Sequence, residues 1–205
     1  MDRTAHWERV YRDKLPDAVS WFQTEARLSR EIIERIAPDR SASIVDIGAG
    51  ASTLVDGLLA AEYQNITVVD ISAAALTRSQ ERLGNAAPGV AWRRADVLTA
   101  PLPADGFDLW HDRAMFHFLT DPDDRAAYVA QVRHAVRPGG HLLIATFAED
   151  GPTKCSGLDV ARYSPRQLQE EFGEGFEPVE HHRELHTTPT GGMQAFTYCL
   201  LRCEV

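Results

Sequence analysis

The chain has 205 residues, of which 44% are hydrophobic and 25% charged, a composition typical of globular proteins. This length fits one α/β domain whose core is large enough to fold without disulfides or a structural metal. The formal net charge of −9 disfavours nucleic acid as a partner, because such a surface repels phosphate backbones. No segment approaches the roughly 20 apolar residues of a membrane span, and the N-terminus has no apolar signal-peptide region. Three cysteines without a CxxC pair favour a reducing compartment, so we expect a cytoplasmic protein with no membrane partner.

Two helices are predicted near the N-terminus. Trp7, Val10 and Tyr11 recur at helical spacing over residues 3–14, and Pro16 ends this segment. A second helix has its apolar residues on one face and stops at Pro38; these residues are Leu28, Ile32, Ile33 and Ile36. An aromatic stretch, residues 19–22, lies between the two helices.

Strand-like and helix-like segments alternate along most of the chain. Short apolar runs predict strands at residues 43–47, 66–70, 90–96, 107–112 and 141–147. Amphipathic segments predict helices at residues 53–63, 72–83 and 121–136. After a Gly- and Pro-rich loop, the last part predicts a short helix at 164–172 and antiparallel strands at 177–187 and 193–202. The alternation predicts an α/β fold with a doubly wound, mostly parallel sheet.

Glycines stand between the first strand and the helix that follows it. Gly48 and Gly50 allow a tight turn and a close approach of backbone to a ligand, beside the free amides of a helix N-terminus. A tight turn alone would also explain them. The pair matches only part of the dinucleotide fingerprint, because Thr53 occupies the third glycine position.

Three carboxylates close three neighbouring strands. Asp46, Asp70 and Asp96 each lie at the carboxyl end of a strand, and these ends should share one rim of the sheet. A carboxylate at position 70, about 20 residues after the glycines, suits ribose hydroxyls. Each of the three would equally serve a local structural role. Asp46 would accept hydrogen bonds from loop amides, Asp70 would stabilise the start of a helix, and Asp96 would be a turn residue.

The ordered series resembles a known family. Asp46-Ile47-Gly48-Ala49-Gly50, Val69-Asp70, Ala95-Asp96-Val97, Phe107-Asp108-Leu109-Trp110 and Arg137-Pro138-Gly139-Gly140 resemble the motifs of class I S-adenosylmethionine-dependent methyltransferases. The resemblance covers residues 20–203. Within the family, the sequence is similar to a subgroup that includes small bacterial methyltransferases and eukaryotic protein-lysine methyltransferases. It implies a Rossmann-like seven-stranded sheet of order 3-2-1-4-5-7-6 with an antiparallel last strand. It also implies one domain over residues 1–205, with residues 1–40 as a helical cap over the site.

The resemblance implies roles for individual residues. Those expected to bind S-adenosylmethionine, or its product S-adenosylhomocysteine, are Asp46, Gly48, Gly50, Ala51, Ser52, Asp70, Ile71, Asp96, Val97, His111 and Trp21. Those expected to bind the acceptor are Trp7, Tyr11, Arg113, Phe116, His117, Phe147, Lys154 and Cys155. Asp112, His111 and His117 are the candidate acid or base groups, although both histidines would equally serve packing or capping. Trp7, Tyr11 and Trp21 would equally form a hydrophobic clamp on the core.

The expected activity is methyl transfer to an acceptor, with a small molecule favoured because little chain remains for a docking domain. A protein-lysine methyltransferase is the first alternative, and a nicotinamide-dependent oxidoreductase or a non-catalytic cofactor binder are further alternatives. No HExxH pattern occurs, so no metal is expected. The segment from Asp112 to Phe118 lacks the Asn-Pro-Pro-Tyr type of motif, which disfavours methylation of nucleic-acid bases.

Overall fold

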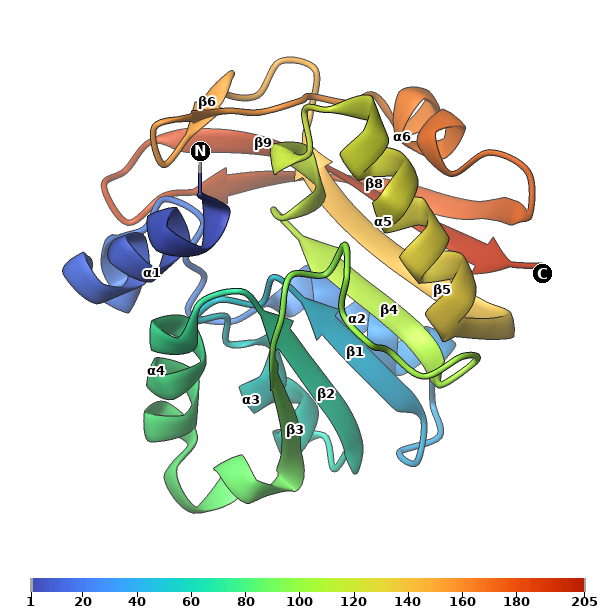
Figure 1. Ribbon diagram of the computed structural model, residues 1–205, viewed down its shortest axis with the longest axis horizontal. Coiled ribbons are helices and arrows are strands. Elements are labelled where there is room, and N and C mark those ends of the chain that lie inside the picture. The colour runs from blue at the N-terminus through green and yellow to red at the C-terminus, as the bar shows by residue number, and fades with distance from the viewer. Residues whose placement is uncertain (1, 205) are drawn as a thin grey trace.

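A seven-stranded sheet runs through the computed structural model, which describes residues 2–204 (Figure 1). In spatial order its strands are β3 (Val90–Arg94), β2 (Asn65–Asp70), β1 (Ser43–Ile47), β4 (Phe107–Arg113), β5 (Val136–Phe147), β9 (Met193–Cys203) and β8 (Phe176–Thr187). The first five are parallel, and β9 runs antiparallel to both β5 and β8. Counting only strands of this sheet, the order is 3-2-1-4-5-7-6, so the predicted fold and topology are confirmed.

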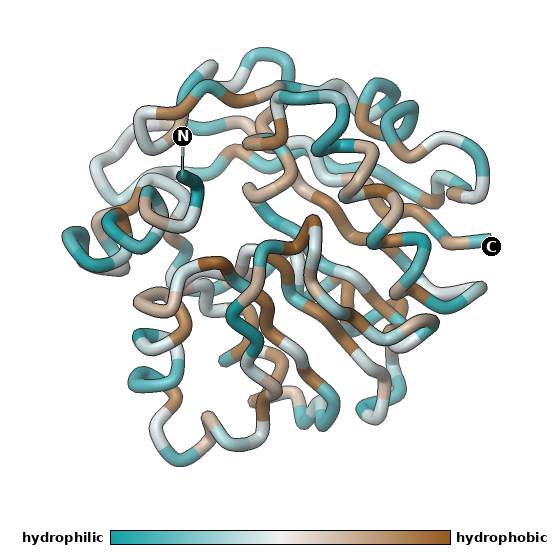
Figure 2. The backbone as a smooth tube through the Cα atoms, viewed as in Figure 1, coloured by the Kyte–Doolittle hydropathy of each residue, from teal (hydrophilic) through white to brown (hydrophobic). Residues whose placement is uncertain are grey.

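Helices cover both faces of the sheet (Figure 1). On one face lie α2 (Arg27–Ile36), α3 (Leu54–Ala60) and α4 (Ala73–Leu83), and on the other lie α5 (Pro122–Ala135) and α6 (Pro165–Phe172). Figure 2 shows the hydrophobic residues concentrated along the central strands. Parallel strands that are covered on both faces in this way read as continuous apolar runs, which is why the sequence predicted them.

Polar caps start three of these helices. The side chain of Ser72 accepts a hydrogen bond from the amide of Ala75, and Asp121 caps α5 in the same way. Ser164 forms a capping box with Gln167, and a proline occupies the first position of α6. Each cap satisfies a backbone amide that has no partner within its helix, so the predicted helix starts at 72, 121 and 164 are confirmed.

Two details of the fold differ from the prediction. Strand β5 begins at Val136, directly after α5, and not at His141; a register shift between β4 and β5 absorbs the Pro-Gly-Gly segment. The predicted loop 148–163 contains a small hairpin of β6 (Lys154–Cys155) and β7 (Leu158–Asp159). Its turn residues Ser156 and Gly157 both have positive φ, 49° and 79°, which matches the twist of a tight hairpin.

The first helix, α1 (Arg3–Asp13), stands apart from the two helical layers, beside the ends of the parallel strands (Figure 1). It continues into a short 3₁₀ helix, η1 (Pro16–Ala18). Of the predicted cap, α1 and the segment 19–23 lie at the rim of the sheet, whereas α2 packs on the sheet through Ile32 and Ile33. Within residues 2–204, no helix is both long and apolar enough to cross a bilayer.

Candidate functional site

A pocket opens at the carboxyl ends of β1, β2 and β4, beneath α1 and the segment 19–23. Strand register sets its floor, because Asp46 on β1 pairs with His111 on β4. Ten of the eleven residues expected to bind the cofactor line this pocket: Trp21, Asp46, Gly48, Ala51, Ser52, Asp70, Ile71, Asp96, Val97 and His111. The eleventh, Gly50, lies directly under the hydroxyl of Tyr11. The structure therefore brings this predicted set together.

The turn after β1 needs glycine at two positions. Gly48 has a φ of +59° and Gly50 a φ of +56°, a conformation that other residues rarely adopt. A Cβ on Gly48 would stand 2.5 Å from the side chain of Met115. A Cβ on Gly50 would stand 1.9 Å from the hydroxyl oxygen of Tyr11. The second glycine therefore lets α1 approach the floor of the pocket.

Asp70 holds this glycine turn. Its two carboxylate oxygens accept hydrogen bonds from the amides of Gly50 (2.7 Å) and Ser72 (2.8 Å). Burial raises the pKa of Asp70 to about 6, although the two amide hydrogen bonds oppose the shift. Each carboxylate oxygen can accept a further hydrogen bond, so Asp70 fits the paired hydroxyls of a ribose.

Asp46 and His111 form a buried pair at the centre of the floor. Asp46 Oδ1 lies 2.7 Å from His111 Nδ1, and His111 Nε2 lies 2.9 Å from the hydroxyl of Ser29. The second oxygen of Asp46 is buried and has no hydrogen-bond partner. A buried acceptor of this kind calls for a donor from a ligand, such as the ammonium group of an amino acid. Both ring nitrogens of His111 are therefore engaged by protein groups.

Two carboxylates tie α1 to the rim. Asp96 accepts from the amide of Leu98 (3.0 Å), and Arg3 on α1 lies 4.0 Å from its other oxygen. Glu8, one turn further along α1, accepts from the hydroxyl of Ser72 (2.9 Å) and the amide of Ala74 (3.2 Å). A carboxylate at the start of α4 is favourable because free amides point toward it. Both contacts hold α1 over the pocket.

Aromatic rings form the wall above the glycine turn. The Trp7 ring lies 4.8 Å from Phe118, 6.0 Å from Trp21 and 6.2 Å from Tyr11, measured between centroids. We call these four residues the aromatic wall. Their π faces attract cations, so the wall suits a sulfonium or an ammonium ion. Three of the four were singled out in the sequence, and Phe118 was not.

Arg113 lines the pocket, but its guanidinium is already occupied. It donates to the hydroxyl of Tyr198 (2.8 Å), the carbonyl of Trp21 (3.0 Å) and a carboxylate oxygen of Glu184 (3.1 Å). These bonds use three of the five guanidinium N–H groups, and the expected contact of Arg113 with the acceptor stays a prediction. Its contacts fix segment 19–23 to β8 and β9.

Asp112 points away from the pocket, contrary to the prediction. Successive residues of a strand face opposite sides, so Asp112 enters the core when His111 faces the rim. There it accepts from the hydroxyl of Tyr128 (2.7 Å) and the amides of Met115 (3.0 Å) and Phe116 (3.1 Å). Phe116 itself is fully buried, so neither of these two predicted site residues reaches the pocket.

His117 also lies outside the pocket lining. It is fully buried between the rings of Phe118 and Phe147, each 4.5 Å away, and its Nδ1 accepts from the amide of Phe147 (3.3 Å). Burial lowers the pKa of His117 to about 3, so the ring is neutral at physiological pH. Phe147 is likewise a core residue, and the expected contacts of both with the acceptor are corrected.

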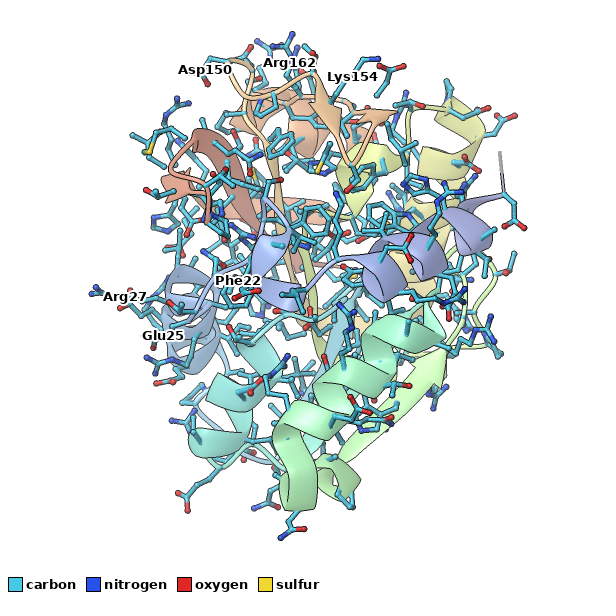
Figure 3. The ribbon with its side chains drawn as sticks, turned by 90° about the vertical axis from the view of Figure 1, so that its left-hand side faces the viewer. Phe22, Glu25, Arg27, Asp150, Lys154 and Arg162 are labelled. Atoms are coloured by element: carbon cyan, nitrogen blue, oxygen red, sulfur yellow. The ribbon has the colours of Figure 1, made fainter. Side chains whose placement is uncertain are left out.

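The loop residues Lys154 and Cys155 are not part of the pocket either. Lys154 projects from the top edge of the molecule, well above Phe22 in the view of Figure 3, and pairs with Asp159 (3.3 Å). Cys155 is buried, and burial raises the pKa of its thiol to about 11. A thiol in this environment stays protonated and unreactive at neutral pH.

Several lining residues had no signal in the sequence. They come from the cap and from the turn after β4, and they are Arg3, Gln23, Ala26, Ala114, Met115, Phe118 and Leu119. The turn is set by Ala114, whose φ is +71°. Non-glycine residues with positive φ cluster at functional sites, but nothing in the residue type announces them.

Asp112 gives a test of this assignment through stability. Burial raises its pKa from 3.8 to about 6. Because the folded-state value is the higher one, the protein should lose on the order of 3 kcal/mol of stability as pH rises from about 4 to about 6, and nothing further above 6. Asp112→Asn removes this titration. Unfolding free energies of both proteins are measured in urea at pH 4.5 to 7.5. As pH rises to 6, the stability of the variant should therefore increase relative to that of the wild type. A constant difference would show that Asp112 is solvated.

Comparisons with known proteins agree with this geometry. A family model described as a methyltransferase domain matches residues 44–140. An uncharacterised methyltransferase of Mycobacterium tuberculosis is 34% identical over 131 residues, covering 62% of this chain and 60% of the relative. The O-methyltransferase cnsE of Penicillium expansum is 26% identical over 78% of this chain and 55% of its own. Human EEF1A lysine methyltransferase 2 is 27% identical over 85% of this chain and 74% of its own.

Solved structures show the same fold at low sequence identity. A protein that converts a disulfide bond into a thioacetal group during echinomycin biosynthesis superposes with a TM-score of 0.77 at 19% identity, covering 98% of this chain and 92% of its own. The 1,6-didemethyltoxoflavin-N1-methyltransferase of Burkholderia thailandensis, solved with S-adenosylhomocysteine, gives 0.69 at 22% identity, covering 87% and 78%. The chain is therefore similar in sequence to a methyltransferase domain over residues 44–140, and it has the fold of S-adenosylmethionine-dependent methyltransferases over most of its length.

Proposed function

We propose that this protein transfers a methyl group from S-adenosylmethionine to a small-molecule acceptor. The observation that carries the proposal is the pocket in which Asp46, Asp70 and Asp96 surround the glycine turn beneath the aromatic wall. The chain spans 60% of the length of the first curated relatives it matches, so its activity is inferred from its own site.

The residues present fit the cofactor. Asp70 would accept from the ribose hydroxyls, Asp96 would lie at the adenine, and the unpartnered oxygen of Asp46 would accept from the ammonium of the methionine part. Gly48 lines the pocket, so the backbone of the glycine turn borders the space that the cofactor would fill. When bound, the cofactor supplies an electrophilic methyl group on a sulfonium centre.

Within the described chain, the residues that line the pocket act by positioning. His111 and Arg113 both have their polar atoms engaged, and the other acid and base candidates lie in the core. The cap and the aromatic wall exclude water, and the floor orients the two reactants, which by itself lowers the barrier to a displacement. Acceptors that need little deprotonation, such as thiolates or carboxylates, suit such a site best.

The cap favours a small acceptor. Helix α1 is held at its start by Arg3, which pairs with Asp124 (2.5 Å) and lies 4.0 Å from Asp96. Glu8 holds its middle to α4, and Tyr11 closes the space above Gly50. A roof fixed in this way leaves little room for a protein segment. The alternative acceptor is a protein lysine, because an aromatic wall also binds ammonium groups and one relative is an EEF1A lysine methyltransferase.

Turnover with labelled S-adenosylmethionine distinguishes a small-molecule acceptor from a protein lysine. The purified protein is incubated with a panel of small thiols, carboxylates, phenols and amines, and in parallel with folded elongation factor 1A and lysine peptides, using Asp70→Ala as the inactive control. Transfer to small acceptors alone supports the proposal. Transfer to lysines alone would replace it by the alternative. The expected cytoplasmic location and the absence of a nucleic-acid partner stay predictions.

A further inference from the structure

The polar floor of the pocket continues into helix α2 through one serine. Ser29 is 1% exposed, and its hydroxyl lies 2.9 Å from Nε2 of His111. Ser29 is the third residue of α2 and lies in the first turn of that helix. Here the side chain is turned inward and completes a chain of three buried groups, Ser29, His111 and Asp46.

The carboxylate of Asp46 determines which of these three groups donates and which accepts each hydrogen bond. An ionised Asp46 can only accept, so Nδ1 of His111 must carry the proton of the 2.7 Å contact. In a neutral imidazole the other nitrogen is then an acceptor, and the hydroxyl of Ser29 donates to it. Ser29 therefore selects the tautomer that serves Asp46, as outer partners do for histidine ligands of metals.

Resting on the function proposed above, we propose that Ser29 is a positioning residue for the amino-acid part of the cofactor. By fixing the ring of His111, it keeps Asp46 Oδ1 occupied and leaves Asp46 Oδ2 free to accept a hydrogen bond from the ligand. Ser29 does not line the pocket, so it acts only through His111. Its loss should affect the amino-acid tail of a ligand and leave the nucleoside part unaffected.

Two ligands separate these parts. S-adenosylhomocysteine carries the amino-acid tail, whereas 5′-methylthioadenosine keeps the nucleoside and the thioether and lacks the tail. Ser29→Ala should weaken binding of S-adenosylhomocysteine about 5- to 30-fold in calorimetry. Binding of 5′-methylthioadenosine should change less than about 2-fold. Equal losses for both ligands, or no loss for either, would overturn the proposal.

Control variants exclude general damage. Thr197→Val removes a buried hydroxyl that bonds the carbonyl of Tyr163 outside the pocket, and it should leave the ratio of the two affinities unchanged. The hydroxyl of Tyr198 also lies within reach of Ser29, so Tyr198→Phe tests whether the effect runs through Arg113. It too should leave the ratio unchanged, and a selective loss here equal to that of Ser29→Ala would contradict the route through His111.

A measurement on the wild-type protein covers the case in which Ser29→Ala does not fold. The ¹⁵N shifts of His111 should show a protonated Nδ1 and an unprotonated Nε2, and the opposite tautomer would overturn the proposal. Failure of the proposed function is distinct, because the wild type would then bind neither ligand. If the wild type binds both and the serine variant matches it, only this inference fails.

Discussion

Asp70→Asn is expected to weaken binding of S-adenosylhomocysteine by about 10- to 100-fold, because a hydrogen bond to a charged group contributes roughly 1.5 to 3 kcal/mol. The carboxylate accepts from the amides of Gly50 and Ser72 with one oxygen each. An asparagine would turn an NH₂ group toward one of these donors, and it would leave fewer acceptors for the ribose. Calorimetry at pH 7.5 measures the change.

A matched control is Asp159→Asn, since Asp159 is an exposed aspartate of the β6–β7 hairpin outside the pocket lining. It should leave the affinity unchanged.

The pH dependence of binding gives a second readout. Because burial raises the pKa of Asp70 to about 6, wild-type affinity should be constant above pH 6 and fall below it as the carboxylate is protonated. The Asn variant should lose this dependence. Wild-type affinity that is flat from pH 5 to 7.5 would contradict the role of Asp70.

Gly50→Ala is expected to have the second large effect, a loss of at least about 10-fold in cofactor affinity. Its new methyl group would stand 1.9 Å from the hydroxyl oxygen of Tyr11, so α1 would have to move off the floor. The aromatic wall would move with it, because Tyr11 and Trp21 lie 6.4 Å apart. Tryptophan fluorescence should therefore shift in the ligand-free protein, and calorimetry should show the weaker binding.

Gly84→Ala isolates the backbone contribution to this effect. Gly84 has a φ of +53°, close to that of Gly50, but nothing lies within 4 Å of the position its Cβ would take. It should lose about 1 to 2 kcal/mol of stability through backbone strain and bind the cofactor as the wild type does. If both variants lowered affinity equally, the contact between Tyr11 and Gly50 would have no role in binding.

The sheet and the cofactor rim could be predicted from the sequence because both depend on local signals. Apolar runs marked the parallel strands, and Ser72 and Ser164 marked helix starts. The three rim aspartates followed from strand ends alone. The hairpin at 154–159 gave no such signal, because its turn is set by the backbone of Ser156 and Gly157.

The acceptor side could not be predicted in the same way. His111 and Asp112 are neighbours on β4, which extends to Arg113, so their side chains must face opposite sides of the sheet. Treating both as rim residues ignored this alternation. The partners that decide their roles come from elsewhere in the chain: Ser29 for His111 and Tyr128 for Asp112. Such contacts depend on the packing of whole helices against the sheet, which no local pattern encodes.

The most direct test of the central claim is a calorimetric titration of the purified protein with S-adenosylmethionine, S-adenosylhomocysteine and NADH, with Asp70→Ala as the control. Both adenosyl ligands should bind with micromolar dissociation constants, about −8 kcal/mol, and the variant should bind them more weakly. NADH should not bind. If NADH bound and neither adenosyl ligand did, the result would contradict the methyltransferase assignment and support a nicotinamide-dependent oxidoreductase.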